Sequence, residues 1–208
     1  MNEREGKKYY TNLEPLTLQH MIAHLEGRRT YGALIGHPDG TTRASIYDAD
    51  TPEAVTIVEE AARRLQAAGY RPLVELSPVR KAHLMIVYTE HVNAYAAHAS
   101  ECKLSPELEN IKEYWPSPSR NKVRLPAGRY VRPSSIGWCT LYDACGQELS
   151  RDGQNTARVL LEYQTPASFV PPESELPTPA RPLRVRSQER SRGSLKRGER
   201  FSAKSLSE

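Results

Sequence analysis

The segment from residue 50 to residue 69 has the clearest secondary-structure signature in this sequence. Asp50 or Thr51 can cap a helix, and Pro52 suits its first position, where a backbone N–H has no intrahelical partner. Gly69 is a typical helix end. The residues between them form an apolar stripe at helical spacing: Val55, Val58, Ala62 and Leu65. The sequence therefore predicts one well-defined helix here.

Strand and helix patterns alternate on both sides of this segment. Upstream, we expect a helix at 17–25 and a hairpin made by strands at 30–35 and 42–48. The turn of that hairpin is His37-Pro38-Asp39-Gly40. Downstream, the expected elements are strands at 72–76 and 84–88, a helix around 93–101, and weaker strands near 111–115 and 122–125. The region 128–153 is expected to be irregular or to form short hairpins.

This order predicts an α+β domain in which helices pack on one face of an antiparallel or mixed sheet. We place the domain at residues 1–164. Residues 165–208 hold six of the sixteen prolines, many serines, and nine basic against five acidic residues, so 9 − 5 = +4, the net charge of the whole chain. Such a composition buries too little apolar surface to fold, which predicts a disordered basic tail.

Other features of the composition limit the class of protein. No segment approaches the run of about 18 apolar residues that spans a bilayer, so we expect a soluble, cytoplasmic protein without a membrane partner. The three cysteines lack the Cys-x-x-Cys pairs typical of zinc modules, and we expect no zinc. A zinc site made by His91, His98 and Cys102 is the less favoured alternative.

Two carboxylates stand at the end of the predicted strand 42–48. Asp48 and Asp50 are two residues apart, so they point to the same face if the strand continues through them. Paired carboxylates repel one another unless a cation lies between them, and hard oxygen ligands suit Mg²⁺ or Mn²⁺. The alternative is that Asp50 only caps the following helix and Asp48 is a solvated strand end.

Further charged residues complete a candidate site. His83 opens the strand 84–88 directly after Arg80 and Lys81, a combination that can hold a triphosphate. Glu113 offers a third carboxylate on a later strand. Three acids and a phosphate-binding histidine are what two-metal nucleotidyl transfer requires.

The same residues carry a resemblance to a known family. The sequence Tyr47-Asp48-Ala49-Asp50 is similar to the Asp-x-Asp motif of the archaeo-eukaryotic primase superfamily, and Lys81-Ala82-His83 stands at its small-x-His motif. Glu113 falls at its third acidic motif. Segments 24–32 and 121–128 resemble its lead-in and its Asn-x-(apolar)-x-Leu-Pro-x-Gly stretch. Within the superfamily, the chain resembles the primase domains of TOTE conflict systems and of related phage and mobile-element replication proteins.

The resemblance spans roughly residues 17–153 and implies an RRM-like catalytic core. It implies a DNA primase-polymerase in which Asp48, Asp50 and Glu113 are catalytic ligands of two Mg²⁺ or Mn²⁺ ions. His83, Lys81 and Arg80 would bind the nucleoside triphosphate. Lys122 and Arg124 would contact a single-stranded DNA template. The expected setting is a bacterial or mobile-element protein that works with a separate helicase or other replication proteins.

The sequence leaves two other functions open. The loop before His83 reads Pro78-Val79-Arg80 and lacks the family's glycines, which favours a primase-like module that binds nucleotide or single strands without turnover. A metal-dependent nuclease using the same three acids is less favoured, because it gives His83 and the Leu-Pro-x-Gly stretch no role.

Overall fold

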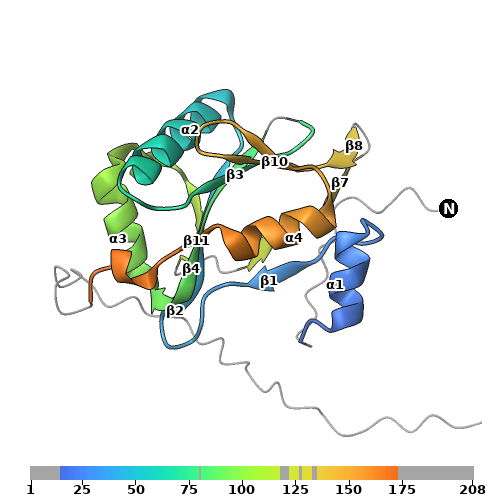
Figure 1. Cartoon of the computed structure of the whole chain (residues 1–208), viewed down its shortest axis with the longest axis horizontal. Helices are drawn as coiled ribbons and strands as arrows, with labels where there is room; N and C mark the ends of the chain where they lie inside the picture. Colours follow the sequence, from blue (N-terminus) through green and yellow to red (C-terminus); the bar gives the residue numbers. More distant parts are fainter. Residues whose placement is uncertain (1–14, 80, 118–121, 127, 133–134, 173–208) are drawn as a thin grey trace, which may run out of the picture.

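A mixed sheet of seven strands forms the centre of the protein (Figure 1). The computed structural model describes residues 15–79, 81–117, 122–126, 128–132 and 135–172 of the 208-residue chain. Six strands follow the order β10-β9-β3-β4-β2-β5, and each neighbouring pair is antiparallel. The short β11 joins β4 in parallel. The bounds of these strands are β2 Thr41–Ala49, β3 Leu73–Leu76, β4 Ala82–Asn93, β5 Glu113–Trp115, β9 Thr140–Asp143, β10 Glu148–Ser150 and β11 Gln164–Thr165.

Four α-helices surround this sheet: α1 Leu18–Leu25, α2 Pro52–Ala67, α3 Ala94–Leu104 and α4 Gly153–Glu162. Thr51, one of the two predicted caps, accepts a hydrogen bond from the backbone N–H of Ala54 and begins α2. Asn93 caps α3 in the same way. Two 3₁₀ helices, Pro106–Asn110 and Ala167–Phe169, complete the helical elements of the described chain. No helix in the described ranges has the length and apolar character needed to cross a membrane.

The sheet separates two apolar clusters. The larger one lies under α2 and α3, where Tyr47, Leu65, Leu84 and Ile86 are fully or almost fully buried. The smaller one lies on the opposite face and contains Ile46, Leu73, Met85, Trp115 and Leu141, with Val159 of α4 packed among them. Neighbouring residues of β2 therefore face different clusters, as strand alternation requires.

Two smaller sheets stand beside the main one. Strand β1 (Gly32–Leu34) pairs with β6 (Lys122–Arg124), and β7 (Arg129–Arg132) pairs with β8 (Ser135–Trp138). The predicted turn at His37–Gly40 is present, with Gly40 at φ 84°, but the predicted hairpin is wrong. An isolated bridge, Gly36 to Thr42, and a hydrogen bond from the Thr42 hydroxyl to the Ile35 carbonyl join the chain before the turn to β2, but the predicted strand 30–35 does not pair with it. β1 instead binds a strand ninety residues further along, a pairing that a local turn signal cannot reveal.

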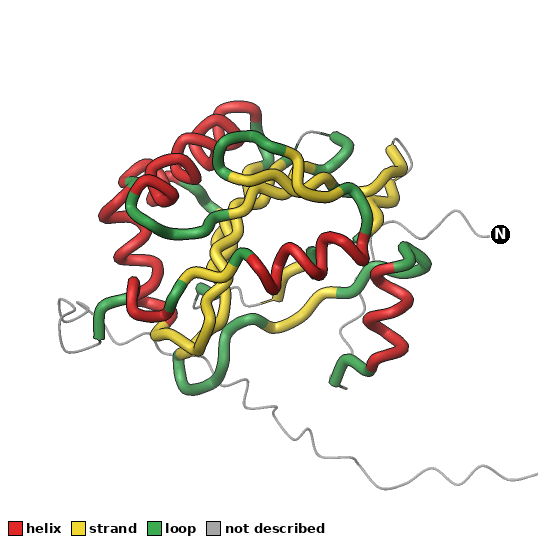
Figure 2. The backbone as a smooth tube through the Cα atoms, viewed as in Figure 1, coloured by secondary structure: helices red, strands yellow, loops and turns green. Residues whose placement is uncertain are grey.

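The α+β class is confirmed, but helices cover both faces. α4 was not predicted, and it packs on the face opposite α2 and α3 (Figure 2). The predicted tail also begins too early. Thr165 is buried and pairs with Tyr88, and Phe169 packs edge-on against Tyr70. Residues 165–172 are therefore part of the described fold, and the remainder of the predicted tail lies outside the described residues.

Candidate active site

Four ionisable residues form a row across the main sheet. Glu75 on β3 pairs with His83 on β4, His83 pairs with Asp48 on β2, and Asp48 pairs with Glu113 on β5. Directly opposed residues of antiparallel strands point to the same face, so all four lie on the face of the smaller apolar cluster. The structure thus brings together Asp48, His83 and Glu113, which are up to 113 − 48 = 65 residues apart in the sequence.

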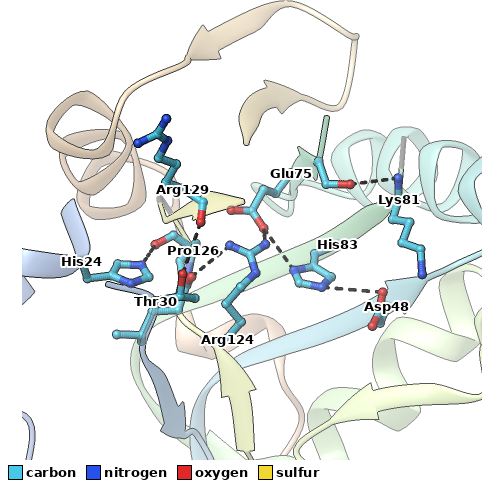
Figure 3. Close-up of polar contacts among 11 residues, drawn as sticks. His24, Thr30, Asp48, Glu75, Lys81, His83, Arg124, Pro126 and Arg129 are labelled. Carbon is cyan, nitrogen blue, oxygen red and sulfur yellow. Dashed lines mark hydrogen bonds and ion pairs between the residues drawn. The ribbon is translucent and has the colours of Figure 1, made fainter. Parts of the chain in front are cut away.

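The His83 ring lies between two carboxylates (Figure 3). Its Nδ1 is 3.1 Å from Oε2 of Glu75, and its Nε2 is 3.6 Å from Oδ1 of Asp48. The ring is mostly buried, with 16% of the side chain exposed. One edge of His83 therefore points into the protein and the other toward the predicted site.

Glu75 was not predicted as a site residue, although it is the most buried acid of the row. Its side chain is 2% exposed and forms an ion pair with the guanidinium of Arg124. Burial raises the pKa of the Glu75 carboxyl, but Arg124 and His83 more than offset this effect and hold the pKa at about 2. One acidic residue inside the apolar run Leu73-Val74-Glu75-Leu76 was the signal available in the sequence.

The pKa of Asp48 is shifted in the opposite direction from that of Glu75. Burial raises the pKa of its carboxyl, His83 lowers it, and the nearby charges of Asp50 and Glu113 raise it further, with a net upward shift. Asp50 follows the end of β2, is half exposed, and forms an ion pair of 2.7 Å with Lys81. Three carboxylates therefore influence one another at this end of the strand.

The carboxylate oxygens of Asp48, Asp50 and Glu113 suit a hard divalent cation, but in this structure they are not gathered around one point. Within the described ranges, no three His, Cys, Asp or Glu side chains are gathered tightly enough to hold a metal ion. Glu113 is partly exposed, and Asp50 is bound to Lys81. For these three carboxylates to share an ion, their side chains would have to come closer together.

The basic residues predicted to bind nucleotide or template do not all lie at the site. Arg80 lies outside the described residues, and of Lys122 only the backbone is described, paired with Leu34. Arg124, predicted to touch the template, directs its guanidinium to Glu75 (Figure 3). In the loop, the Lys81 backbone N–H donates to the Ser77 hydroxyl at 3.1 Å, and the Ser77 N–H donates to the Lys81 carbonyl.

The two outlying sequence segments meet at His24. Its Nδ1 accepts a hydrogen bond from the Tyr31 backbone N–H at 3.1 Å, so its Nε2–H donates to the Pro126 carbonyl at 2.9 Å. Gly128 lies against the His24 ring, where a Cβ would come within 2.5 Å of a ring carbon. Segment 24–32 and the described residues 122–126 and 128 therefore build one unit that carries Arg124.

A second polar cluster lies on the other face of the sheet. Glu101 of α3 is fully buried and accepts hydrogen bonds from the hydroxyls of Tyr47, at 2.5 Å, and Tyr88. His98 stacks on Tyr114 with ring centroids 4.0 Å apart, and it also contacts Cys102. His91 instead packs against His37, so the three residues of the alternative zinc site are not brought together.

Comparison with known proteins adds no family assignment. No protein-family model matches the sequence, and no curated protein matches it.

Proposed function

We propose that this protein is a metal-dependent nucleotidyltransferase of the primase-polymerase type, with its active site at Asp48, Asp50, Glu113 and His83. The observation that carries the proposal is the register of the sheet. Asp48 has His83 directly opposite on one side and Glu113 directly opposite on the other. Two acids and a histidine from three separate motifs share one row on one face.

The electrostatics support a cation at this position. Burial raises the pKa of Asp48 most, the like charges of Asp50 and Glu113 raise it further, and His83 and Lys81 lower it, so this position gathers negative charge. Asp48, Asp50 and Glu113 would hold Mg²⁺ or Mn²⁺. Bound ions would activate the attacking hydroxyl of the growing strand and stabilise the leaving pyrophosphate.

The remaining side chains suit the triphosphate. His83 presents Nε2 on the Asp48 side, and Lys81 supplies a positive charge at the mouth of the site, 47% exposed. Phosphate oxygens are good acceptors for both. A bound triphosphate would compete with Asp50 for the Lys81 ammonium.

A primase-like binding module without turnover is the second candidate. The observation that favours it is the loop before His83, where Lys81 is already paired with Asp50 and no glycine opens the backbone to phosphate. A protein of this kind would bind nucleotide or single strands but would form no phosphodiester bond.

Primer extension on a single-stranded DNA template with Mn²⁺ and nucleoside triphosphates tests the proposal. We expect extension by the full chain and loss of at least about a hundredfold in rate for Asp48→Asn, the size of effect typical when a group stabilising transition-state charge is removed. Asp39→Asn is the matched control, because it makes the same change in the turn before β2, at the other end of the strand.

The products separate the three functions. Nucleotide binding without extension in the wild type would support the binding module, and shortened template would support a nuclease. Asp48→Asn with undiminished extension would contradict the assignment of the site.

A further inference from the structure

The innermost carboxylate of the row contacts the site through His83. Oε2 of Glu75 contacts both Nδ1 of His83 and the guanidinium of Arg124. It is almost completely buried, so neither solvent nor substrate reaches it. We infer that Glu75, fixed by Arg124, is a positioning residue that holds the His83 ring with Nδ1–H donated inward and Nε2 turned to the Asp48 side. The consequence for nucleotide binding rests on the proposed function; the ring orientation does not.

The chemistry of the contact determines which nitrogen carries the proton. A carboxylate paired with a guanidinium is ionised and can only accept hydrogen bonds. The His83 nitrogen at 3.1 Å from it must therefore be the donor, so the neutral ring is the Nδ1–H tautomer. Nε2 then faces the Asp48 side. In the neutral ring it can only accept a hydrogen bond or coordinate a cation, and it donates to a phosphate oxygen when both ring nitrogens carry a proton.

A continuous set of contacts holds Arg124 in place. Arg124 ends β6, whose backbone pairs with β1 from Gly32 to Leu34. The residues after β6 are fixed by the hydrogen bond from His24 to the Pro126 carbonyl (Figure 3). The unit built by segment 24–32 and residues 122–126 and 128 thus presents a cation to Glu75. This gives both segments a role at the site without direct contact with substrate.

A purely structural ion pair is the competing explanation, and two double variants separate it from positioning. Glu75→Leu with Arg124→Met removes the ion pair and the acceptor for His83. Glu75→Gln with Arg124→Met removes the same ion pair but keeps an amide oxygen that can accept from Nδ1–H. Replacing both members of a buried pair avoids an uncompensated charge, so both proteins are expected to fold. Any template contact of Arg124 is lost equally in both.

The first readout is the tautomer of His83, measured by long-range ¹H–¹⁵N NMR on the full chain without metal or nucleotide. His83→Asn assigns the signal among the six histidines. We expect the Nδ1–H tautomer in the wild type and in the double variant with Glu75→Gln (the glutamine variant). In the double variant with Glu75→Leu (the leucine variant), we expect a shift toward the Nε2–H tautomer. An unchanged tautomer in the leucine variant would overturn the inference.

The second readout is nucleotide dependence in the extension assay with Mn²⁺. Glu75→Leu/Arg124→Met is expected to raise KM for the nucleoside triphosphate about tenfold, by analogy with the loss on removing an outer partner of a metal-ligating histidine, because the His83 ring loses the acceptor that orients it. Glu75→Gln/Arg124→Met is expected to recover most of the loss. Equal KM values in both variants would make the pair purely structural. If the wild type shows no extension while the tautomer shifts as expected, the proposed function fails and the positioning role stands.

Discussion

Two buried glutamates on opposite faces of the same sheet show how the partner decides the state of a carboxyl group. Glu75 lies on β3 beneath His83, and Glu101 lies on α3 beneath Tyr47 and Tyr88. Both are essentially without exposed surface. Glu75 has a guanidinium and an imidazole as partners, whereas the partners of Glu101 are hydroxyl groups.

The pKa values diverge accordingly. Burial raises the pKa of both groups, but at Glu75 the charges of Arg124 and His83 reverse the shift and give about 2. At Glu101 the hydroxyls of Tyr47, Tyr88 and Ser45 lower the pKa less than burial raises it, and the result is about 7. A full charge opposite a buried carboxylate outweighs desolvation, and neutral hydrogen bonds do not. The candidate site is built on the face with the permanent charges.

The strongest test of this comparison removes the cation from Glu75. Arg124→Met leaves a buried carboxylate without its main partner, which we expect to reduce the free energy of unfolding by about 3–5 kcal/mol at pH 7. Urea denaturation measures the change. Arg64→Met is the control, because Arg64 forms its ion pair with Glu107 at the surface, where solvent screens it, and its loss should cost far less. A loss for Arg124→Met no larger than the control would mean that the charge of Arg124 does not fix Glu75.

The second test concerns Glu101 and pH. Its folded pKa of about 7 lies above the ordinary value of 4.5, so the folded state binds more protons than the unfolded state between these values. Stability from this group is complete below pH 4.5 and is lost as pH rises through 7, by about 3 kcal/mol in total. Glu101→Gln should abolish that loss.

The measurement is the difference between wild-type and Glu101→Gln unfolding free energies from pH 4.5 to 8. A difference is needed because His24 and His98, whose pKa values burial lowers, contribute the opposite slope in this range. Parallel curves for the two proteins would show that Glu101 is not held neutral.

A smaller effect is expected at the tyrosine hydroxyls. Tyr47→Phe removes a hydrogen bond to Glu101 that is strongest when the carboxyl is ionised, so it should cost about 1–2 kcal/mol at pH 8 and less at pH 5. Denaturation at the two pH values measures this. Tyr114→Phe is the control. The Tyr114 ring stacks on His98 in the same cluster, so its replacement should show no such pH dependence.

The smallest effect is expected at Asp48. Without metal, Asp48→Asn removes a charge that Asp50 and Glu113 repel, so the protein should gain a few tenths of a kcal/mol while losing nucleotide addition. Thermal unfolding without divalent ions measures the gain. A clear destabilisation would show that the contact with His83 outweighs the repulsion.

The sequence predicts the local elements better than their partners. Helix α2 and the strands β2, β3 and β4 follow from periodicity, caps and turns, and strand alternation placed Asp48 on a definite face. The pairing of β1 with β6 depends on residues ninety positions apart and has no local signal. The same limit applies to the candidate site: the acids stand in recognisable motifs, whereas Glu75 acquires its role only because Arg124 is brought to it.

The long-range origin of the Glu75–Arg124 pair has a consequence for the order of folding. Glu75 and His83 are eight residues apart in a hairpin that closes a short loop, whereas Arg124 is 49 residues from Glu75 and the His24 bond to Pro126 closes a loop of 102. Short loops close sooner and at a lower entropic cost. We therefore expect the β3–β4 hairpin to form with its carboxylate still lacking a cation, and burial of that face to be unfavourable until β6 docks. During synthesis, we expect this end of the sheet to stay unstable at least until the chain through β6 has left the ribosome.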